Sequence, residues 1–479
     1  MYNILHKVIN ENLNYGAAEK NSKERVLVEY VSANPTGPLH VGHGRGAAYG
    51  DSLSNLLETA GYNVYREYYV NDAGRQIDIL TISVWLRMIE MCNLKINYPI
   101  NCYQGTYIND IAKEFQQSYN VSEYIPENLE FLEHDDNDLE LYIDNIIHAA
   151  KLFLEHNYIT LSDFTVQYIM KQCSNILDGF RVKYDNWYSE KSLFTTNKVR
   201  DAIDELNANG FLYKKDGALW FKSTQFGDEK DRVIQRENGL YTYFASDIAY
   251  HLDKFRRGFD RVINIWGADH HGYVPRIKSA LSAFGIDSEK LDVILIQFIS
   301  YKQGNEKKSM STRSGNFISM DELLSKVNVD NARYYYVASK PQNHITFFID
   351  LLNSKKSINK VYYIQYAHAR ICSVLQKANF NYNEHIDFNF GLDIEHNIID
   401  KIKTYPDVIQ RAASKYDLLM IIDYLIALSE LLHNYYNQCR FLGNDNFNLM
   451  NSRFTLLLAI SYVIRNGLNI IGVSAPEKM

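Results

Sequence analysis

The feature that most constrains the fold is the order of a strand, a glycine-rich loop, a helix and a second strand between residues 26 and 70. The runs VLVEYVS (26–32) and NVYREYYV (63–70) carry the β-branched and aromatic residues that are typical of strands. Between them, the loop NPTGPLHVGHGRG (34–46) leads into a helical stretch that ends at Ala60 and Gly61. This order is typical of a βαβ unit, in which both strands belong to one parallel sheet.

The rest of the chain extends this sheet and then becomes helical. The segments 261–266 and 291–300 predict two further strands, with a helix over 274–284 between them. Residues 93–185 are less regular and interrupt the sheet, and apolar residues recur at a helical period from Leu418 to Tyr436. We therefore expect an α/β protein. A doubly wound parallel sheet of the Rossmann type spans 1–92 and 186–352, an inserted connective segment spans 93–185, and an all-α bundle spans 353–479.

The composition indicates a cytoplasmic protein without a membrane span. The apolar run from Leu456 to Val473 contains Arg465 and is typical of a buried helix, and the first residues lack the pattern of a secretion signal. The five cysteines have no regular spacing, which favours reduced thiols over a disulfide framework or a zinc site. A net charge of −7 argues against general affinity for nucleic acid but allows a local basic face at KFRRGFDR (254–261).

The loop that contains His40, Gly42 and His43 is a candidate anion site. The first turn of a helix offers unpaired backbone N–H groups and the positive end of the helix dipole. Glycines let a phosphate approach the backbone, and two imidazoles three residues apart can donate hydrogen bonds from one side. A capped turn with exposed histidines explains these residues equally well, so the loop alone does not decide.

A second loop, KKSMSTRSGN (307–316), makes the anion interpretation stronger. It is basic and rich in hydroxyl groups, and it follows an apolar strand. Alone it would be read as a solvated surface loop. Together, the two loops fit a transfer reaction at the α-phosphate of a nucleotide, in which positioning and charge neutralisation carry most of the catalysis. The chain has no GxxxxGK[ST] sequence, so a P-loop NTPase is not supported.

These motifs resemble those of the arginyl-tRNA synthetase family. HVGH (40–43) resembles the HIGH signature of class I aminoacyl-tRNA synthetases, and SMSTR (309–313) resembles their KMSKS loop. Nearly the whole chain is similar to the narrower family, through the segments VEYVSANPTGPLHVGHGRG (28–46), YTYFASDIA (241–249), WGADHHGYVPR (266–276), QYAHAR (365–370) and SAPEKM (474–479). The resemblance implies an arginine–tRNA ligase, which forms arginyl-adenylate from L-arginine and ATP and transfers arginine to the terminal adenosine of tRNA(Arg).

The resemblance also implies roles for individual residues. Glu29 and Asp247 are expected at the guanidinium with Tyr243 beside them, and Asn34 and His270 at the backbone groups of arginine. Tyr243 and Asp247 are four residues apart, which places them on one face of a helix; taken alone, Asp247 could equally be a helix cap. The residues implied in ATP binding and catalysis are His40, Gly42, His43, Asp269, Met310, Ser311 and Arg313. We expect Mg²⁺ to accompany ATP and expect no zinc.

The C-terminal helices resemble the anticodon-binding bundle of the family. Tyr362, Tyr366, Tyr435 and Met479 are candidates for contact with anticodon bases, although core packing explains each tyrosine taken singly. We expect a monomer.

Two departures from the family pattern leave an alternative function open. Ser309 and Thr312 stand where the KMSKS loop has lysines, so Arg313 with Lys307 or Lys308 would supply the charge. The first predicted strand also begins near residue 26, from which we expect that most of the family's N-terminal domain is lacking. The alternative is a tRNA-binding paralogue that does not activate arginine efficiently.

Overall fold

A five-stranded parallel sheet lies at the centre of the computed structural model, which describes residues 2–129, 138–297, 299–303, 306–308, 318–348, 359–443 and 446–479. The strand order is β3–β2–β1–β7–β8, with the first strand in the middle, as the doubly wound prediction requires. The strands are β1 (Arg25–Glu29), β2 (Asn63–Val70), β3 (Asn186–Ser189), β7 (Arg261–Gly267) and β8 (Leu291–Ile296).

Alternate residues of β1 enter two different apolar clusters, so the sheet is covered on both faces. Val26 and Val28 belong to the cluster that includes α2 (Val41–Thr59), whereas Leu27 belongs to the cluster that includes α9 (Tyr243–Arg256) and α10 (Val274–Ala283). The next residue on the Leu27 side is Glu29, which therefore faces α9 rather than α2.

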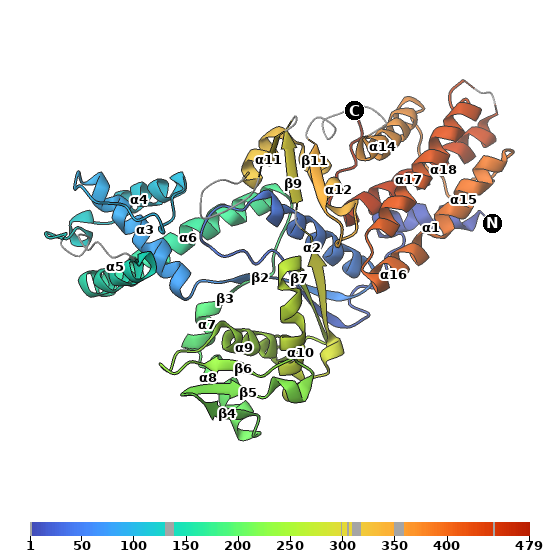
Figure 1. Cartoon of the computed structure of the whole chain (residues 1–479). Helices are drawn as coiled ribbons and strands as arrows, with labels where there is room; N and C mark the ends of the chain where they lie inside the picture. The colour runs from blue at the N-terminus through green and yellow to red at the C-terminus, as the bar shows by residue number, and fades with distance from the viewer. Residues whose placement is uncertain are drawn as a thin grey trace.

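Helices fill the chain between β2 and β3 and form a lobe beside the sheet (Figure 1). These helices are α3 (Arg75–Met91), α4 (Thr106–Ser118), α5 (Leu139–Leu154) and α6 (His156–Gly179). Because α3 packs against α4, α5 and α6, the helical lobe begins before residue 93. The predicted boundaries at 93 and 185 stay predictions.

The segment after β3 forms a second small unit below the sheet in the view of Figure 1. It contains α7 (Glu190–Thr195), α8 (Lys198–Ala208) and an antiparallel sheet of β4 (Leu212–Lys215), β5 (Ala218–Phe221) and β6 (Arg232–Gln235). Helix α8 packs against α9, which lies between this unit and the central sheet.

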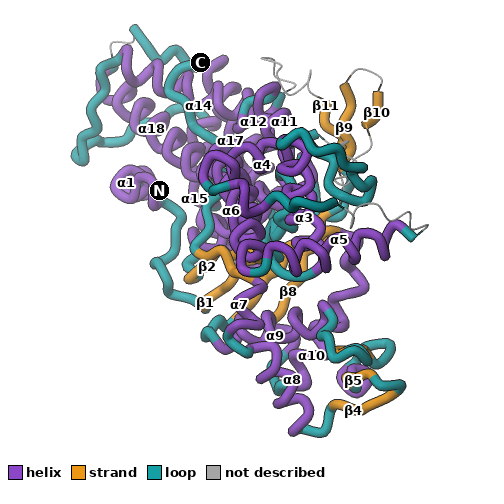
Figure 2. The backbone as a smooth tube through the Cα atoms, turned by 90° about the vertical axis from the view of Figure 1, so that its left-hand side faces the viewer, coloured by secondary structure: helices purple, strands orange, loops and turns teal. Residues whose placement is uncertain are grey.

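The predicted strand over 291–300 is wrong as one element. Strand β8 ends at Ile296, and β9 (Ile299–Gln303) begins a separate sheet with β10 (Glu306–Lys308) and β11 (Ile345–Phe348). This three-stranded sheet lies apart from the central one in Figure 2. Between β10 and β11, the chain forms two helices, α11 (Met320–Lys326) and α12 (Val329–Val337).

The C-terminal part is a helical bundle, as predicted. It contains α14 (Lys360–Lys377), α15 (Asp393–Lys403), α16 (Tyr405–Lys415), α17 (Leu419–Gln438) and α18 (Phe447–Ile470). The N-terminal helix α1 (Asn3–Glu11) packs against α18 and α15, so the start of the chain is part of this bundle (Figure 1). Among the described residues, α18 is the one helix long and apolar enough to cross a membrane, but 67% of its apolar window is buried inside the protein, as in a core helix.

Candidate active site

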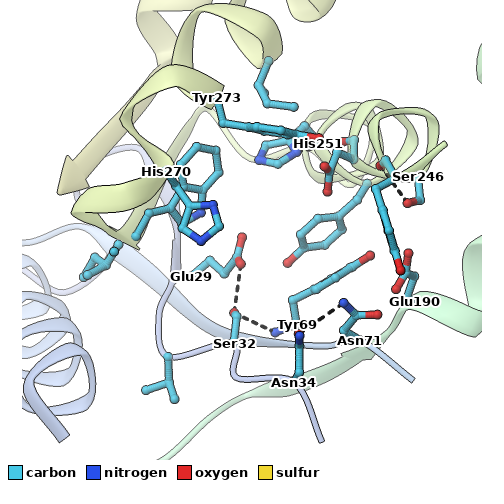
Figure 3. A pocket seen from close by; sticks show the side chains of 18 of the residues that line it. Glu29, Ser32, Asn34, Tyr69, Asn71, Glu190, Ser246, His251, His270 and Tyr273 are labelled. Atoms are coloured by element: carbon cyan, nitrogen blue, oxygen red, sulfur yellow. Dashed lines mark hydrogen bonds between the residues drawn. The ribbon is translucent and has the colours of Figure 1, made fainter. Parts of the chain in front are cut away.

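A pocket of about 460 Å³ opens at the carboxyl ends of β1 and β7, where parallel sheets usually bind ligands. The five residues predicted to contact arginine all line it: Glu29, Asn34, Tyr243, Asp247 and His270. They come from the end of β1, the loop after it, the first turns of α9 and the loop after β7. Figure 3 shows Glu29, Asn34 and His270 around the same space.

Asp247 carries the most perturbed carboxyl group of the pocket. Burial, followed by the negative charge of Glu190, raises its pKa to about 7, while a hydrogen bond from Tyr273 acts in the opposite direction. A group in this state ionises more readily when a cation enters the pocket. Asp247 is therefore suited to bind a cationic ligand, which would favour the ionised form of its carboxyl group.

Glu190 is the second uncompensated carboxylate, and the sequence analysis missed it. It is the first residue of α7, it is buried, and it lines the pocket. Burial raises its pKa, while hydrogen bonds from Ser246 and Tyr69 act in the opposite direction. Tyr69 lies on the same pocket wall. A buried carboxyl group with a raised pKa ionises more readily when a cation enters the pocket, so Glu190 also suits a cationic ligand.

Glu29 is in a different state because it already has partners. Its Oε2 atom accepts a hydrogen bond of 2.5 Å from Lys254 Nζ, and its Oε1 atom accepts one of 2.9 Å from Ser32 Oγ. A carboxylate oxygen can accept a second hydrogen bond, so Glu29 can still contact a ligand. Its charge, however, is balanced by Lys254 before any ligand arrives.

The chain makes a strained turn directly after Glu29. Val31 has a φ of 69° and Ser32 a φ of 42°, in the left-handed region that a β-branched residue such as valine rarely adopts. The Ser32 hydroxyl holds the turn, since it donates to Glu29 and accepts from the backbone N–H of Tyr69 at 3.1 Å. Strain of this kind is typical of functional sites, and both residues line the pocket.

The remaining arginine candidates lie at the rim. Asn34 donates to Gln76 Oε1 at 2.8 Å and accepts from Asn71 Nδ2 at 3.2 Å, so its amide is oriented by two neighbours that also line the pocket. His270 and Asp269 are both largely exposed, with 3.6 Å between His270 Nε2 and Asp269 Oδ2. Asp269 does not line the pocket but adjoins it.

The two histidines of the first loop are packed against each other at the start of α2. His40 is the N-cap, and its ring stacks on that of His43 with centroids 3.7 Å apart. His40 Nδ1 accepts from the backbone N–H of Gly42 at 3.1 Å, and His43 Nδ1 accepts from the N–H of His40 at 3.2 Å. Burial lowers the pKa of both rings, so both are neutral and carry their proton on Nε2.

Gly42 is required by this arrangement for a reason the sequence did not show. A Cβ atom at Gly42 would lie 2.8 Å from Cε1 of the His40 ring. The loop is also joined to the chain that follows the second loop: the Val41 N–H donates to Ile318 O, and the Met320 N–H donates to Leu39 O. Neither His40, Gly42 nor His43 lines the pocket of the five arginine candidates.

Most of the second loop, from residue 309 onwards, lies outside the described residues. Met310, Ser311 and Arg313 lie outside the described residues, so their predicted roles stay predictions. Lys307 and Lys308 belong to β10, which pairs with β9.

The helical bundle brings together three of the four candidate tRNA contacts. Tyr366 and Met479 line one hollow of about 420 Å³ together with Arg370 and Lys478, and Tyr362 stacks near Tyr366 with ring centroids 6.0 Å apart. The prediction for Tyr435 is wrong. Its side chain has no exposed surface, and its hydroxyl donates to Glu395 at 2.7 Å, so it is a core residue that cannot stack on a base.

The local basic face that the sequence allows at residues 254–261 does not form. Lys254 is fully buried against Glu29, and Arg257 is paired with Glu67. Arg256 and Arg261 are paired with Glu205 and Asp292. Since the carboxylates balance these charges within the protein, the segment is part of the fold rather than an open cationic surface.

Over the described ranges, no cluster of three or more histidine, cysteine, aspartate or glutamate side chains is arranged to hold a metal ion. The carboxylates of the pocket suit recognition of a cation, and the start of α2 suits an anion.

Comparison with known proteins decides the family. The model of the class I tRNA synthetase (R) catalytic domain matches residues 4–367, and the DALR anticodon-binding domain matches residues 364–479. The chain belongs to the arginyl-tRNA synthetase family. The resemblance seen in the sequence is thereby confirmed, as is the expected combination of a Rossmann-type domain with a helical anticodon-binding domain.

Individual relatives agree with this membership. The arginine–tRNA ligase of Thioalkalivibrio sulfidiphilus is 48% identical over 480 residues, covering 97% of this chain and 81% of the relative. That of Acinetobacter baylyi is 45% identical over 490 residues, covering 97% and 82%. A Campylobacter jejuni protein assigned as an arginyl-tRNA synthetase has a solved structure that is 35% identical, with a TM-score of 0.86, covering 100% of this chain and 98% of its own. The Thermus thermophilus arginyl-tRNA synthetase, at 20% identity and a TM-score of 0.75, shares the fold and covers 99% and 86%.

Proposed function

We propose that this chain is an arginine–tRNA ligase that uses ATP to form arginyl-adenylate and then charges tRNA(Arg). The observation that supports this most is the pocket itself. It holds two carboxyl groups with raised pKa values, Asp247 and Glu190, and a third, Glu29, whose charge is already balanced. A guanidinium is planar and permanently charged and offers five donors, which is what such a set of acceptors suits.

In the first step, the pocket holds the guanidinium while the carboxylate of arginine attacks the α-phosphorus of ATP and pyrophosphate leaves. Asn34 and His270, at the rim, face the backbone groups of arginine. The Nε2–H groups of His40 and His43 donate to phosphate oxygens at the start of α2, and Asp269 accepts from the ribose. Neutral imidazoles suit this role because they donate without needing to gain a proton.

In the second step, a ribose hydroxyl of the terminal adenosine of tRNA attacks the activated carbonyl and AMP leaves. Mg²⁺ enters with ATP, on the phosphates rather than in a dedicated protein site. Arg313 adds positive charge at the phosphates and Ser311 a hydroxyl donor, with Met310 beside them in the same loop. At the other end of the molecule, Tyr362, Tyr366 and Met479 contact the anticodon loop. The enzyme works as a cytoplasmic monomer.

The paralogue without efficient activation is less well supported. The family relatives at 45–48% identity are named arginine–tRNA ligases, and the pocket residues that a ligase needs lie together in this chain. The replacement of both loop lysines by Ser309 and Thr312 is the observation that keeps this second function testable.

ATP–pyrophosphate exchange with arginine and tRNA(Arg) present separates the two functions. The ligase gives exchange that depends on arginine, followed by charging of the tRNA. Exchange no greater than that of heat-inactivated protein, together with tight tRNA binding, would instead establish the paralogue.

A further inference from the structure

A row of three polar residues crosses the central sheet beneath α9. Glu67 on β2, Glu29 on β1 and Asn264 on β7 are partners in the strand register, so their side chains leave the same face at the same level. All three are buried. The positions next to them on the Glu29 side, such as Leu27 and Val262, are apolar core. A polar row in this place is unusual for a sheet covered by a helix.

Lys254 of α9 lies over this row. Its Nζ atom donates to Glu29 Oε2 at 2.5 Å and to Asn264 Oδ1 at 2.9 Å, and it lies 4.2 Å from the centre of the Tyr250 ring. The Tyr250 hydroxyl in turn donates to Glu67 at 2.9 Å. Lys254 has no exposed surface, so its ammonium group is held entirely by these partners.

The contacts continue from Lys254 to the residue that the substrate meets. Asn264 Nδ2 lies 2.7 Å from His251 Nε2, and His251 Nδ1 lies 2.8 Å from the backbone carbonyl of Asp247. A carbonyl can only accept, so His251 Nδ1 carries the proton, Nε2 accepts from the Asn264 amide, and the amide oxygen accepts from Lys254. One set of hydrogen bonds thus joins the Glu29 carboxylate to the backbone of Asp247.

The charge balance of the pocket depends on Lys254. Three carboxylates, those of Glu29, Glu190 and Asp247, line a pocket that has to receive one guanidinium. The ammonium of Lys254 cancels the charge of Glu29 and leaves two carboxylates for the ligand. Without it, one guanidinium would face three neighbouring carboxylates, and Glu29 would lose the donor that orients its Oε2 atom.

We propose that Lys254 is a positioning residue that makes the pocket selective for arginine. It neutralises Glu29 and keeps it as a hydrogen-bond acceptor, and it occupies the place in which the ammonium of a substrate lysine would pair with Glu29. This inference rests on the proposed function and deepens it. It names lysine, a cation of similar length, as the amino acid that this device excludes. Arginine avoids the competition because its guanidinium reaches Asp247 and Glu190 instead.

A purely structural role for Lys254 predicts something different. Removal of one partner of a buried ion pair destabilises the fold, because the other charge stays buried without compensation. If Lys254 only held α9 on the sheet, its loss would lower stability and activity together, without changing the choice between amino acids. The distinction therefore needs kinetic constants for two amino acids, not an activity measurement alone.

The test uses Lys254→Met and Lys254→Gln in the full chain, with Arg453→Met as the matched control. Arg453 forms a buried ion pair of 2.8 Å with Glu395 in the helical bundle, away from the pocket. Glutamine keeps a hydrogen-bond donor without the charge, so the Lys254→Gln variant is used for the measurements if Lys254→Met does not fold. Thermal melting and ATP–pyrophosphate exchange are measured for each protein, with L-arginine and with L-lysine as substrate.

We expect both Lys254 variants to raise the KM for arginine about tenfold with kcat changed less than about threefold, because the reacting carboxylate lies at the far end of the substrate. We also expect the preference for arginine over lysine to fall at least about tenfold. Arg453→Met should lower the melting temperature without changing either quantity. Unchanged KM and unchanged preference in the Lys254 variants would overturn the inference. Absence of arginine-dependent exchange in the wild type would instead refute the proposed function.

Discussion

Arginine binding should depend on pH through the carboxyl group of Asp247. Its pKa is raised to about 7 by burial and by Glu190 in the unliganded pocket. The guanidinium binds the ionised form, so below pH 7 each binding event must first release a proton. Because Asp247 and Glu190 interact, the titration belongs to the pair rather than to one residue.

The magnitude follows from this pKa. With a single group at pH 7, the apparent dissociation constant increases by a factor of about 11 at pH 6 and about 1.1 at pH 8, so affinity should fall about tenfold over this range. The difference between the ordinary pKa of 3.8 and about 7 corresponds to roughly 4 kcal/mol, which is the order of the interaction that a bound cation can recover. Arginine itself does not change its side-chain charge over this range.

Isothermal titration calorimetry of L-arginine between pH 6 and pH 8 measures both quantities. Buffers with different ionisation enthalpies report the protons released, which should approach one per arginine at pH 6 and fall towards zero at pH 8. The reasoning would be refuted if affinity were independent of pH over this range, or if affinity were greater at pH 6 than at pH 8.

Four substitutions extend the account. Asp247→Asn should lower kcat/KM for arginine at least about 100-fold, since an amide cannot supply the charge, and loss of less than about threefold would remove Asp247 from the pocket assignment. The pKa of the Asp247 carboxyl is raised on folding, so its ionisation lowers the free energy of unfolding as pH rises from 3.8 to about 7. Asparagine does not ionise, so Asp247→Asn without ligand should melt roughly 2 °C or more above wild type at pH 8. An equal or lower melting temperature would contradict the sign of this effect. Glu190→Gln should weaken arginine binding about tenfold while leaving the KM for ATP unchanged, and a change in the KM for ATP alone would speak against its place in the pocket. His43→Ala should lower kcat of activation about 100-fold with little effect on arginine binding, which stopped-flow or exchange kinetics can separate. Gly42→Ala should behave like a weaker His43 variant because its Cβ would meet the His40 ring at 2.8 Å, and full activity would show that the ring can move without loss.

The fold was largely predictable because the hydrophobic pattern of the α/β part is strong. Strands β2 and β7 and helix α2 lie within a residue or two of their predicted positions, whereas β1 ends at Glu29, three residues before its predicted end at Ser32. Strand β3 was missed because four residues are too few to show a period, and the break between β8 and β9 was missed because both strands are apolar. A continuous apolar sequence does not show where the chain leaves one sheet and enters another.

The site was predictable only where residues belong to a motif. Glu29, Asn34, Tyr243, Asp247 and His270 were found through the family resemblance, and the pocket brings them together. Glu190 has no such signal: a glutamate at the start of a six-residue helix is usually an exposed cap, and only the fold buries it beside Asp247.

The same limit explains one wrong prediction, for Tyr435, and one possible basic face that does not form, at Lys254. Tyr435 lies on the apolar stripe of α17, and a tyrosine there is equally compatible with core packing and with a surface platform. Lys254 stands in a basic run that reads as a surface, yet its partners come from two strands, β1 and β7, one of them far away in the sequence. Burial of a charge depends on partners that no local pattern reveals.

The central claim is that the carboxylates of Asp247 and Glu190 hold arginine, while the neutral imidazoles of His40 and His43 at the start of α2 hold ATP, for adenylate formation. A crystal structure with L-arginine and a non-hydrolysable ATP analogue tests it most directly. We predict the guanidinium within hydrogen-bond distance of both Asp247 and Glu190, and phosphate oxygens within the same distance of Nε2 of His40 and His43. An arginine side chain bound outside this pocket, or a nucleotide bound away from the start of α2, would contradict the account.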